Sequence, residues 1–208
     1  MNFLIADDHA IVRKGLSQII CEEFVDANIS EASNSNETLN FIKKKSFDVI
    51  LLDISMPGQN GLEILKQLRD MNIKTPVLIL SVYPEDQYAA RVLKAGASGY
   101  LNKDTATSEL ITAIKKVLAG KKYISSSFAE KLAEGINIDS TKPLHDLLSD
   151  REMQVFQLLA AGKTVGEIAE NIFLSVNTVS TYRTRILEKL GLNNNAEIMK
   201  YALDNNIL

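Results

Sequence analysis

The sequence predicts an α/β domain with a doubly wound, five-stranded parallel sheet, followed by a small all-α domain that contains a helix-turn-helix. Through the first 120 residues, short aliphatic segments alternate with amphipathic ones, which is the pattern of a parallel sheet covered by helices on both faces. After residue 148, four helix signals follow one another closely, and two of them open with the same capping pattern. Between these two regions the periodicity weakens.

The aliphatic segments are the expected strands. They are Asn2–Ala6, Asn28–Ala32, Val49–Asp53, Val77–Leu80 and Gly99–Asn102. The expected helices are Ala10–Glu23, Asn36–Lys44, Gly61–Met71, Pro84–Ala95 and Thr107–Ala119. Because crossover connections in parallel sheets are right-handed, the expected strand order is the flavodoxin-like 2-1-3-4-5, with the first and third strands side by side. In the first helix, the apolar pattern predicts that Ile11, Leu16, Ile19 and Ile20 face inward.

The rest of the chain divides into a linker and a second domain. We place the first domain at residues 1–120, the linker at 121–144 and the second domain at 145–208. A short helix is expected inside the linker, near residues 128–134.

Local capping patterns define the helices of the second domain. Ser149 with Glu152, and Thr164 with Glu167, match the capping box, in which a hydroxyl and a carboxylate satisfy free backbone N–H groups. The first of these helices is expected to bury Val155, Leu158 and Leu159. A short helix, a tight connection and a longer helix, Val176–Leu190, then form the helix-turn-helix, and a last helix spans Asn195–Asn205.

Composition indicates a globular protein without membrane segments. The chain has 208 residues and a net charge of −3, and no apolar run reaches the length of a membrane span. Its amino terminus lacks the basic segment of a signal peptide, so we expect a cytoplasmic protein with no membrane partner. The single cysteine, Cys21, excludes an internal disulfide and is expected to be a small buried hydrophobe.

Polar side chains follow four of the five expected strands. Asp7 and Asp8 follow the first strand and Asp53 ends the third, so three carboxylates converge if these strands are neighbours. Ser81 and Lys103 follow the fourth and fifth strands and reach the same edge. Mg²⁺ prefers carboxylate, carbonyl and water oxygens, and it makes a carboxylate a competent nucleophile toward phosphorus by holding the phosphoryl oxygens. This set of groups suits reversible phosphorylation of a carboxylate.

In their order and spacing, residues 1–120 resemble the receiver domain of bacterial response regulators. The matching positions are Asp7, Asp8, Asp53, Pro57, Gly58, Ser81, and Gly99 to Lys103. The resemblance implies that Asp53 accepts phosphate from a sensor histidine kinase. It also implies that Mg²⁺ binds Asp7, Asp8, Asp53 and the backbone carbonyl of Ser55. Lys103 would pair with the phosphoryl group, Ser81 would donate a hydrogen bond to it, and Tyr100 would swing inward behind Ser81. His9, beside the acidic pair, is expected only to open the first helix at the surface.

Helical spacing sorts the residues of the longer second-domain helix into two faces. Val176, Val179, Tyr182 or Arg183, Ile186 and Leu190 follow the spacing of a buried stripe. The opposite face carries Asn177, Ser180, Thr181, Thr184 and Glu188. Hydroxyl and amide groups of this kind contact base edges, and Arg183, Arg185 and Lys189 at the flanks suit phosphates.

The second domain resembles the LuxR-type DNA-binding domain. The resemblance rests on Leu148 to Glu152, Gly162 to Thr164, Glu167 to Ala169 and Thr178 to Gly191. A receiver joined to this module is the architecture of the NarL and FixJ group. It implies a helix in the major groove of promoter DNA, with Asn177, Thr178, Ser180, Thr181, Arg183, Thr184, Arg185 and Lys189 as contacts. Residues 143–208 carry six basic and eight acidic side chains, which predicts weak binding by a monomer and a role for a homodimer on activation. RNA polymerase is a further partner that this architecture allows.

Two alternatives stay open at this point. A phosphohydrolase with Asp53 as nucleophile would need a second acid near it, where the chain has Ile54 and Ser55. Otherwise no enzyme activity is expected beyond Mg²⁺-dependent phosphotransfer and self-dephosphorylation at Asp53. In the second alternative the receiver is a phosphate-independent dimerisation platform, because Val82 and Tyr83 leave Tyr100 little room to move. Asp104 stands where receivers usually have a proline, so a cis peptide after Lys103 is not expected.

Overall fold

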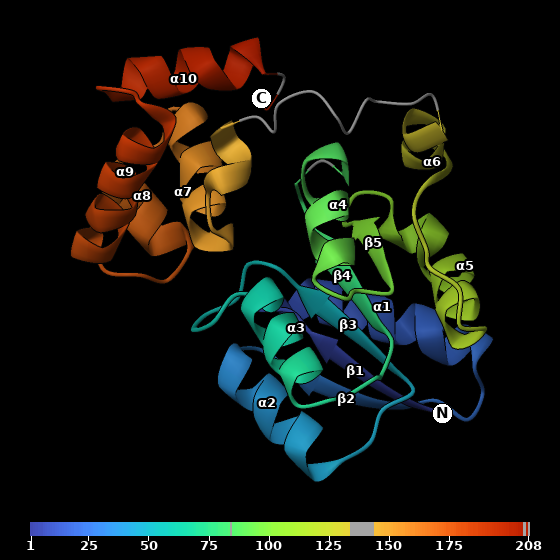
Figure 1. Ribbon diagram of the computed structural model, residues 1–208. Coiled ribbons are helices and arrows are strands. Elements are labelled where there is room, and N and C mark those ends of the chain that lie inside the picture. Colours follow the sequence, from blue (N-terminus) through green and yellow to red (C-terminus); the bar gives the residue numbers. More distant parts are fainter. Residues whose placement is uncertain (84, 134–143, 206, 208) are drawn as a thin grey trace. The chain divides into compact units, whose positions relative to one another are not determined.

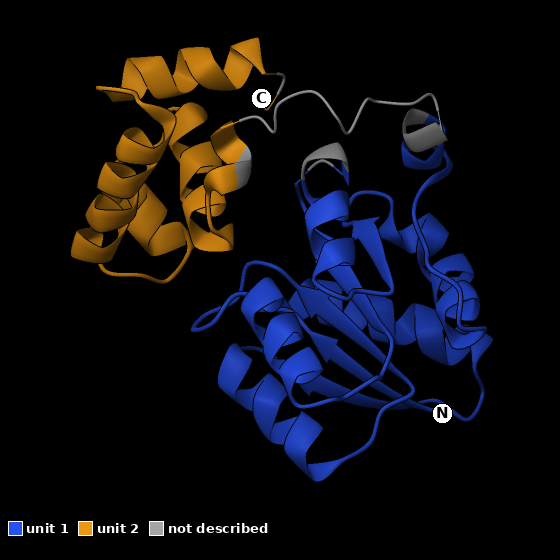
Figure 2. Ribbon diagram, in the orientation of Figure 1, with its two compact units in different colours: residues 1–136 blue, residues 137–208 orange. Residues whose placement is uncertain are grey.

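The computed structural model describes residues 1–83, 85–133, 144–205 and 207. The chain forms two compact units, residues 1–136 and 137–208, which are considered separately (Figure 2). Pro84, at the start of one predicted helix, and residues 134–143, which include the end of another and much of the predicted linker, lie outside the described residues.

The first unit contains the predicted parallel sheet. Its strands are β1 (Asn2–Ala6), β2 (Asn28–Ala32), β3 (Val49–Asp53), β4 (Val77–Ser81) and β5 (Gly99–Asn102). They pair in the order β2-β1-β3-β4-β5, all parallel, which confirms the predicted topology (Figure 1). β3 and β4 are buried throughout, as expected for central strands covered on both faces. The adjacent β1 and β3 bring the residues that follow Ala6 and Leu52 to the same edge.

Six helices of the first unit are described, each within about two residues of its predicted bounds. They are α1 (Ala10–Glu23), α2 (Ser35–Lys44), α3 (Gly61–Asp70), α4 (Glu85–Lys94), α5 (Ala106–Leu118) and α6 (Ser126–Ala133). One face of the sheet packs against α1 and α5 through Leu16, Ile20, Leu110 and Ile114. Figure 1 shows α2 and α3 across the other face.

Two predictions about α1 are wrong. Ile11 is 88% exposed rather than inward, and Cys21 is exposed rather than buried. At 100° per residue, each lies about 140° around the helix from Leu16, on opposite sides of it. Leu16 and Ile20 define the buried stripe and Ile19 is half-buried at its margin, so neither Ile11 nor Cys21 can reach the sheet.

The second unit is helical. It consists of the 3₁₀ turn η1 (Leu144–Leu147), α7 (Asp150–Ala160), α8 (Val165–Asn171), α9 (Val176–Leu190) and α10 (Asn195–Asp204). Both predicted capping boxes are present, and the Ser175 hydroxyl accepts from the backbone N–H of Thr178 to cap α9. Gly191, with a φ of 65°, ends α9 in the left-handed conformation that glycine adopts most easily.

The buried stripe of the helix-turn-helix is shorter than predicted. Val179, Ile186 and Leu190 are buried, whereas Val176 is 52% exposed. Val176 shares a face with Val179, but it is the first residue of α9, and the core does not extend to this end of the helix. In α7, Val155 and Leu159 are buried as expected, while Leu158 is only half-buried.

Candidate functional site

Three carboxylates and one ammonium group meet at the carboxyl edge of the sheet. Asp7 follows β1, and its backbone N–H donates to the carbonyl of Ala32 at 3.1 Å. Asp7 is fully buried and Asp53, at the end of β3, is 2% exposed. One ligand atom from each of Asp7, Asp8, His9 and Asp53 lies within 4.8 Å of all the others. The structure therefore brings together the acidic residues that the sequence predicted.

Lys103 lies between two of these carboxylates. Its ammonium nitrogen is 2.7 Å from Oδ2 of Asp7 and 2.8 Å from Oδ2 of Asp53. Its backbone N–H donates to the carbonyl of Ser81 at 2.8 Å, which ties the end of β5 to the end of β4. Lys103 is thus placed to meet a group attached to Asp53.

Burial dominates the electrostatics of the cluster. It raises the pKa of Asp53 to about 7, and repulsion from Asp7 adds to this effect while attraction to Lys103 opposes it. For Lys103, burial alone would lower the pKa, but the attraction of Asp53 and Asp7 outweighs it and the pKa is raised. One ammonium group therefore faces three carboxyl groups, and an added cation would favour the ionised form of Asp53.

The oxygen atoms of the cluster fit a hard divalent cation. Oδ2 of Asp7, Oδ1 of Asp8 and Oδ2 of Asp53 are buried, and none accepts a hydrogen bond of normal geometry within the described part of the chain. Their neighbours at ion-pair distance are the Lys103 ammonium group and the His9 imidazole. Carboxylate oxygens are among the ligands that Mg²⁺ prefers.

The loop after β3 holds Asp53 in place. The backbone N–H of Ser55 hydrogen-bonds the Asp53 carboxylate, and Gly61 N–H donates to the carbonyl of Ile54 at 2.9 Å. A Cβ atom at Gly61 would lie 2.2 Å from the backbone oxygen of Asp53, so only glycine fits there. Ser55 itself is half-buried.

Ser81 and Tyr100 lie beside the cluster, as predicted. Ser81 is 1% exposed, and its hydroxyl accepts from the N–H of Tyr83 at 3.0 Å. The Tyr100 ring is buried, and its hydroxyl donates to the carbonyl of Tyr83 at 2.6 Å. The pKa of Tyr100 is raised, because the effect of burial outweighs that of a hydrogen bond with the Ser81 hydroxyl, which lowers it. The two hydroxyls and the loop before α4 therefore form one connected group.

The two residues after Ser81 differ in burial. Val82 is 61% exposed, so most of its side chain lies outside the core that contains Tyr100. Tyr83 is half-buried and stacks on Tyr88, with ring centroids 5.0 Å apart. The peptide bonds of the described residues are all trans, including the one between Lys103 and Asp104.

His9 is closer to the cluster than sequence reasoning suggested. It is the residue before α1, and its side chain is 63% exposed, as expected for a surface position. However, its Nδ1 atom lies 2.7 Å from Oδ1 of Asp8 and 3.1 Å from Oδ1 of Asp7. The only signal in the sequence was its position next to the acidic pair.

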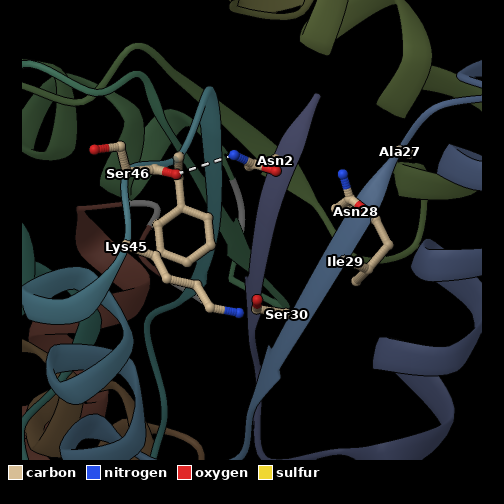
Figure 3. A pocket seen from close by; sticks show the side chains of 8 residues that line it. Asn2, Ala27, Asn28, Ile29, Ser30, Lys45 and Ser46 are labelled. Carbon is tan, nitrogen blue, oxygen red and sulfur yellow. Dashed lines mark hydrogen bonds between the residues drawn. The ribbon is translucent and has the colours of Figure 1, made fainter.

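A pocket elsewhere in the first unit contains none of the predicted site residues. It has a volume of about 620 Å³ and lies at the opposite, amino-terminal end of β1 and β2 (Figure 3). Asn2, Asn28, Lys45 and Ser46 are among its lining residues, and Asn2 Nδ2 donates to the carbonyl of Ser46 at 3.4 Å. It has no acidic lining residue, so it offers no carboxylate that could accept a phosphoryl group.

In the second unit, α9 presents a polar surface. The predicted base-contacting residues Asn177, Ser180, Thr181 and Thr184 are all exposed. Asn177, Thr178, Thr181, Tyr182 and Arg185 line a shallow hollow of about 330 Å³. The hydroxyls of Thr181 and Thr184 donate to the carbonyls of Asn177 and Ser180, which leaves their oxygen lone pairs available to accept from a ligand.

Two of the predicted phosphate-contacting residues have partners within the unit. Lys189 Nζ lies 2.6 Å from Oε2 of the buried Glu152 and 3.3 Å from the carbonyl of Leu147. Arg183 Nε donates to Oδ1 of Asn195 at 2.6 Å. Arg185 is exposed at the hollow, so it is the cation best placed on this surface.

Comparison with known proteins assigns each unit to a family. Residues 3–115 match the response regulator receiver domain, and residues 146–202 match the luxR family of bacterial regulatory proteins. The response regulator UvrY of Escherichia coli K12 is 34% identical over 204 residues, which cover 98% of this chain and 94% of UvrY. The putative positive transcription regulator BvgA of Bordetella pertussis is 36% identical, with 98% and 97% covered.

A solved structure shares the full architecture. RcsB of Salmonella enterica serovar Typhimurium, bound to the promoter rprA in the presence of the phosphomimetic BeF₃⁻, is 27% identical. The match covers 97% of this chain and 98% of that chain, with a TM-score of 0.65.

These findings define a transcriptional response regulator, a class of protein that joins a receiver to a helix-turn-helix. Within it, the chain belongs to the NarL and FixJ group, in which the second module is of the LuxR type. Membership of this family decides against the phosphohydrolase alternative. Among the described helices, none combines the length and the apolar character that crossing a membrane requires.

Proposed function

We propose that Asp53 accepts a phosphoryl group from a sensor histidine kinase and that this change promotes dimerisation and binding of α9 to promoter DNA. The observation that carries the proposal is the buried Asp53 carboxylate, 2% exposed, with the Lys103 ammonium 2.8 Å away. Asp7, Asp8, Asp53 and the backbone carbonyl of Ser55 would hold Mg²⁺. We place the protein in the cytoplasm, where kinase, DNA and RNA polymerase are accessible to it.

The side chains around Asp53 account for the reaction. An Asp53 oxygen attacks the phosphorus of the phosphohistidine; the P–N bond breaks as the P–O bond forms, and the kinase histidine leaves with the electron pair. A bound Mg²⁺ supplies charge neutralisation at the phosphoryl oxygens. The phosphoryl group adds a charge of about −1.5 to −2 at Asp53. The Lys103 ammonium group, which contacts Asp7 and Asp53 before the reaction, then pairs with the phosphoryl group. The Ser81 hydroxyl turns from Tyr100 toward the same group.

The response reaches α4 and β5 through Tyr83. When Ser81 turns, its contacts with Tyr100 and with the Tyr83 N–H change together, since one hydroxyl makes both. Tyr83 directly precedes the loop into α4, and Tyr100 belongs to β5. A local electrostatic event is thereby converted into a change of surface on these two elements. Because Val82 is 61% exposed, its side chain gives little support to the phosphate-independent platform, which needs it to crowd Tyr100.

Labelling tests the acceptor. With Mg²⁺ and radiolabelled acetyl phosphate, the wild-type protein is expected to gain base-labile label, and the Asp53→Asn protein to gain none, because an amide cannot form the acyl phosphate. Asp48→Asn, an exposed aspartate at the other end of β3, is the matched control and should label normally. Undiminished labelling of Asp53→Asn would show that the acceptor is another residue.

Substitutions on α9 test the DNA-binding surface. The structures of RcsB bound to the promoter rprA and to DNA support a DNA-binding role. Arg185→Ala and Thr181→Ala are each expected to weaken promoter binding by about 1–3 kcal/mol if they contact bases, measured by fluorescence anisotropy at fixed salt. Lys44→Ala, an exposed cation on α2, removes the same charge and should leave affinity unchanged. If the combined Arg183→Ala, Thr184→Ala protein and both single variants footprint normally, the assigned surface is wrong.

A further inference from the structure

We propose that Tyr123 is a positioning residue that couples the Asp53 switch to the start of the linker, because its docking against β5 depends on the state of Tyr100. The inference rests on the proposed phosphorylation of Asp53 and adds the route by which it leaves the sheet. Tyr123 follows α5 and lies outside the residues to which the sequence assigned a role.

Backbone hydrogen bonds attach Tyr123 to the outer edge of β5. Its N–H donates to the carbonyl of Ser98 at 2.8 Å, and its carbonyl accepts from the N–H of Tyr100 at 3.3 Å. Gly99 and Tyr123 form a parallel bridge, and Tyr123 is 5% exposed. Tyr100, whose hydroxyl hydrogen-bonds the loop beside Ser81, is thus held at its backbone by the beginning of the linker.

Gly99 is the residue that makes this contact possible. A Cβ atom at position 99 would lie 2.6 Å from the carbonyl oxygen of Tyr123 and 2.8 Å from its Cβ atom. Real Cβ atoms do not approach backbone so closely, so any other residue would push Tyr123 away from the strand. The close approach of the two backbones therefore explains the glycine in β5.

Side chains fasten the same segment to both neighbouring helices. The Tyr123 hydroxyl donates to Oε2 of Glu109 at 3.0 Å, and Lys116 Nζ lies 5.1 Å from the ring centroid, so the ring is fixed to α5. Two residues further on, the N–H of Ser125 donates to Oε1 of Glu85, the first residue of α4, at 3.0 Å. The Ser125 hydroxyl then accepts from the N–H of Phe128 in the first turn of α6.

The start of the linker therefore contacts the two elements that the switch is expected to move. A displacement of β5 with Tyr100 would change the 3.3 Å bond first, because it is longer than the 2.8 Å bond beside it. A displacement of α4 would carry Glu85 away from Ser125. The free energy of docking Tyr123 on β5 is expected to differ between phosphorylated and unphosphorylated Asp53. Linkage then requires that a substitution that weakens the docking also shifts the equilibrium between the two conformations of the first unit.

A simpler role for Tyr123 makes a different prediction. A segment that follows the last helix can merely cover a sheet edge, which prevents edge-to-edge association. An edge cover would be equally protected with and without phosphorylation. A coupling element changes its protection together with α4 and β5.

Amide hydrogen exchange of the full chain distinguishes these roles. With Mg²⁺ and beryllofluoride, which mimics the acyl phosphate, the amides of residues 122–128 are expected to exchange at a rate changed by about fivefold or more. Asp53→Asn should show no change. Altered exchange in the β4–α4 peptides with unaltered exchange in 122–128 would overturn the inference but not the proposed function. Unaltered exchange in every peptide would overturn both.

Two variants test whether the docking of Tyr123 couples the state of Asp53 to the affinity for DNA. Glu85→Ala removes the acceptor of Ser125, and Gly99→Ala displaces Tyr123 from β5. Each is expected to reduce the beryllofluoride-induced gain in promoter affinity by about fivefold or more, while occupancy of Asp53, followed by ¹⁹F NMR, is retained. Lys122→Ala, at the exposed residue before Tyr123, is the control and should retain the gain. A full gain in Glu85→Ala would overturn the inference, even if Gly99→Ala fails to fold.

Discussion

Lys103→Met is expected to lower the free energy of unfolding of the first unit by about 3–5 kcal/mol at pH 8 without Mg²⁺, because it leaves two buried carboxylates without their shared cation. Asp7 is fully buried and Asp53 nearly so, and Lys103 lies within 2.8 Å of both. Methionine preserves the length and apolar character of the side chain, so the loss reports the charge. Urea unfolding of the full chain, with amide exchange of the β1 and β3 peptides to isolate this unit, measures it.

The pH dependence of this loss follows from Asp53. Its pKa is raised from 3.8 to about 7 in the folded protein, so the folded state binds the extra proton between these values. The stability that this proton confers is complete below about pH 4 and is lost as the pH rises through 7. Removing Lys103 raises the pKa of Asp53 further. At pH 5 Asp53 is already protonated in both proteins, so the difference between them should be smaller than at pH 8.

A double-mutant cycle identifies the partner. In the Asp53→Asn protein, Lys103→Met removes the ammonium group from Asp7 alone and should cost about 1–2 kcal/mol less than in the wild type. Lys115→Met, which breaks an exposed ion pair with Glu23 between α5 and α1, is the matched control and should cost less than about 1 kcal/mol. Equal costs of Lys103→Met in both backgrounds would mean that Lys103 and Asp53 are not coupled.

The predictable part of this protein depends on local patterns and simple topology. The strand order and the meeting of Asp7, Asp53, Ser81 and Lys103 followed from the rule that parallel strands deliver their carboxyl ends to one edge. The capping boxes at Ser149 and Thr164 are local as well, and both were found. The predictions that failed concern the angular position of a residue on its helix or the extent of the core. Ile11 lies off the buried stripe of α1, and Val176 lies past the end of the core of the second unit.

Long-range partners could not be read from the chain. The Lys189 ammonium group forms an ion pair with Glu152, 37 residues earlier in the chain. Its predicted contact with DNA phosphates therefore competes with this ion pair. Glu152 also caps α7, and its pKa is lowered by Lys189 and Ser149 in spite of burial. The bridge between Tyr123 and Gly99 is likewise not indicated by any periodic pattern in the sequence. Such contacts arise from tertiary packing, which period and spacing do not encode.

Gly61→Ala is expected to destabilise the first unit by about 3 kcal/mol or more, although alanine is the better helix former by roughly 1 kcal/mol. Gly61 is the first residue of α3 and is buried beside Asp53, the proposed phosphoacceptor. The new Cβ atom would lie 2.2 Å from the backbone oxygen of Asp53 and 2.9 Å from its carbonyl carbon. Backbone cannot yield as a flexible side chain can, so either α3 shifts or the end of β3 does.

The matched control is Gly15→Ala in α1. Gly15 is exposed and its Cβ atom would have no neighbour within 4 Å, so the same substitution should stabilise by about 0.5–1 kcal/mol. Because the clash falls on Asp53 itself, Gly61→Ala should also slow labelling by acetyl phosphate under conditions in which the protein remains folded, whereas Gly15→Ala should not. Stabilisation by both substitutions would show that the loop after β3 yields easily and does not hold Asp53 in place.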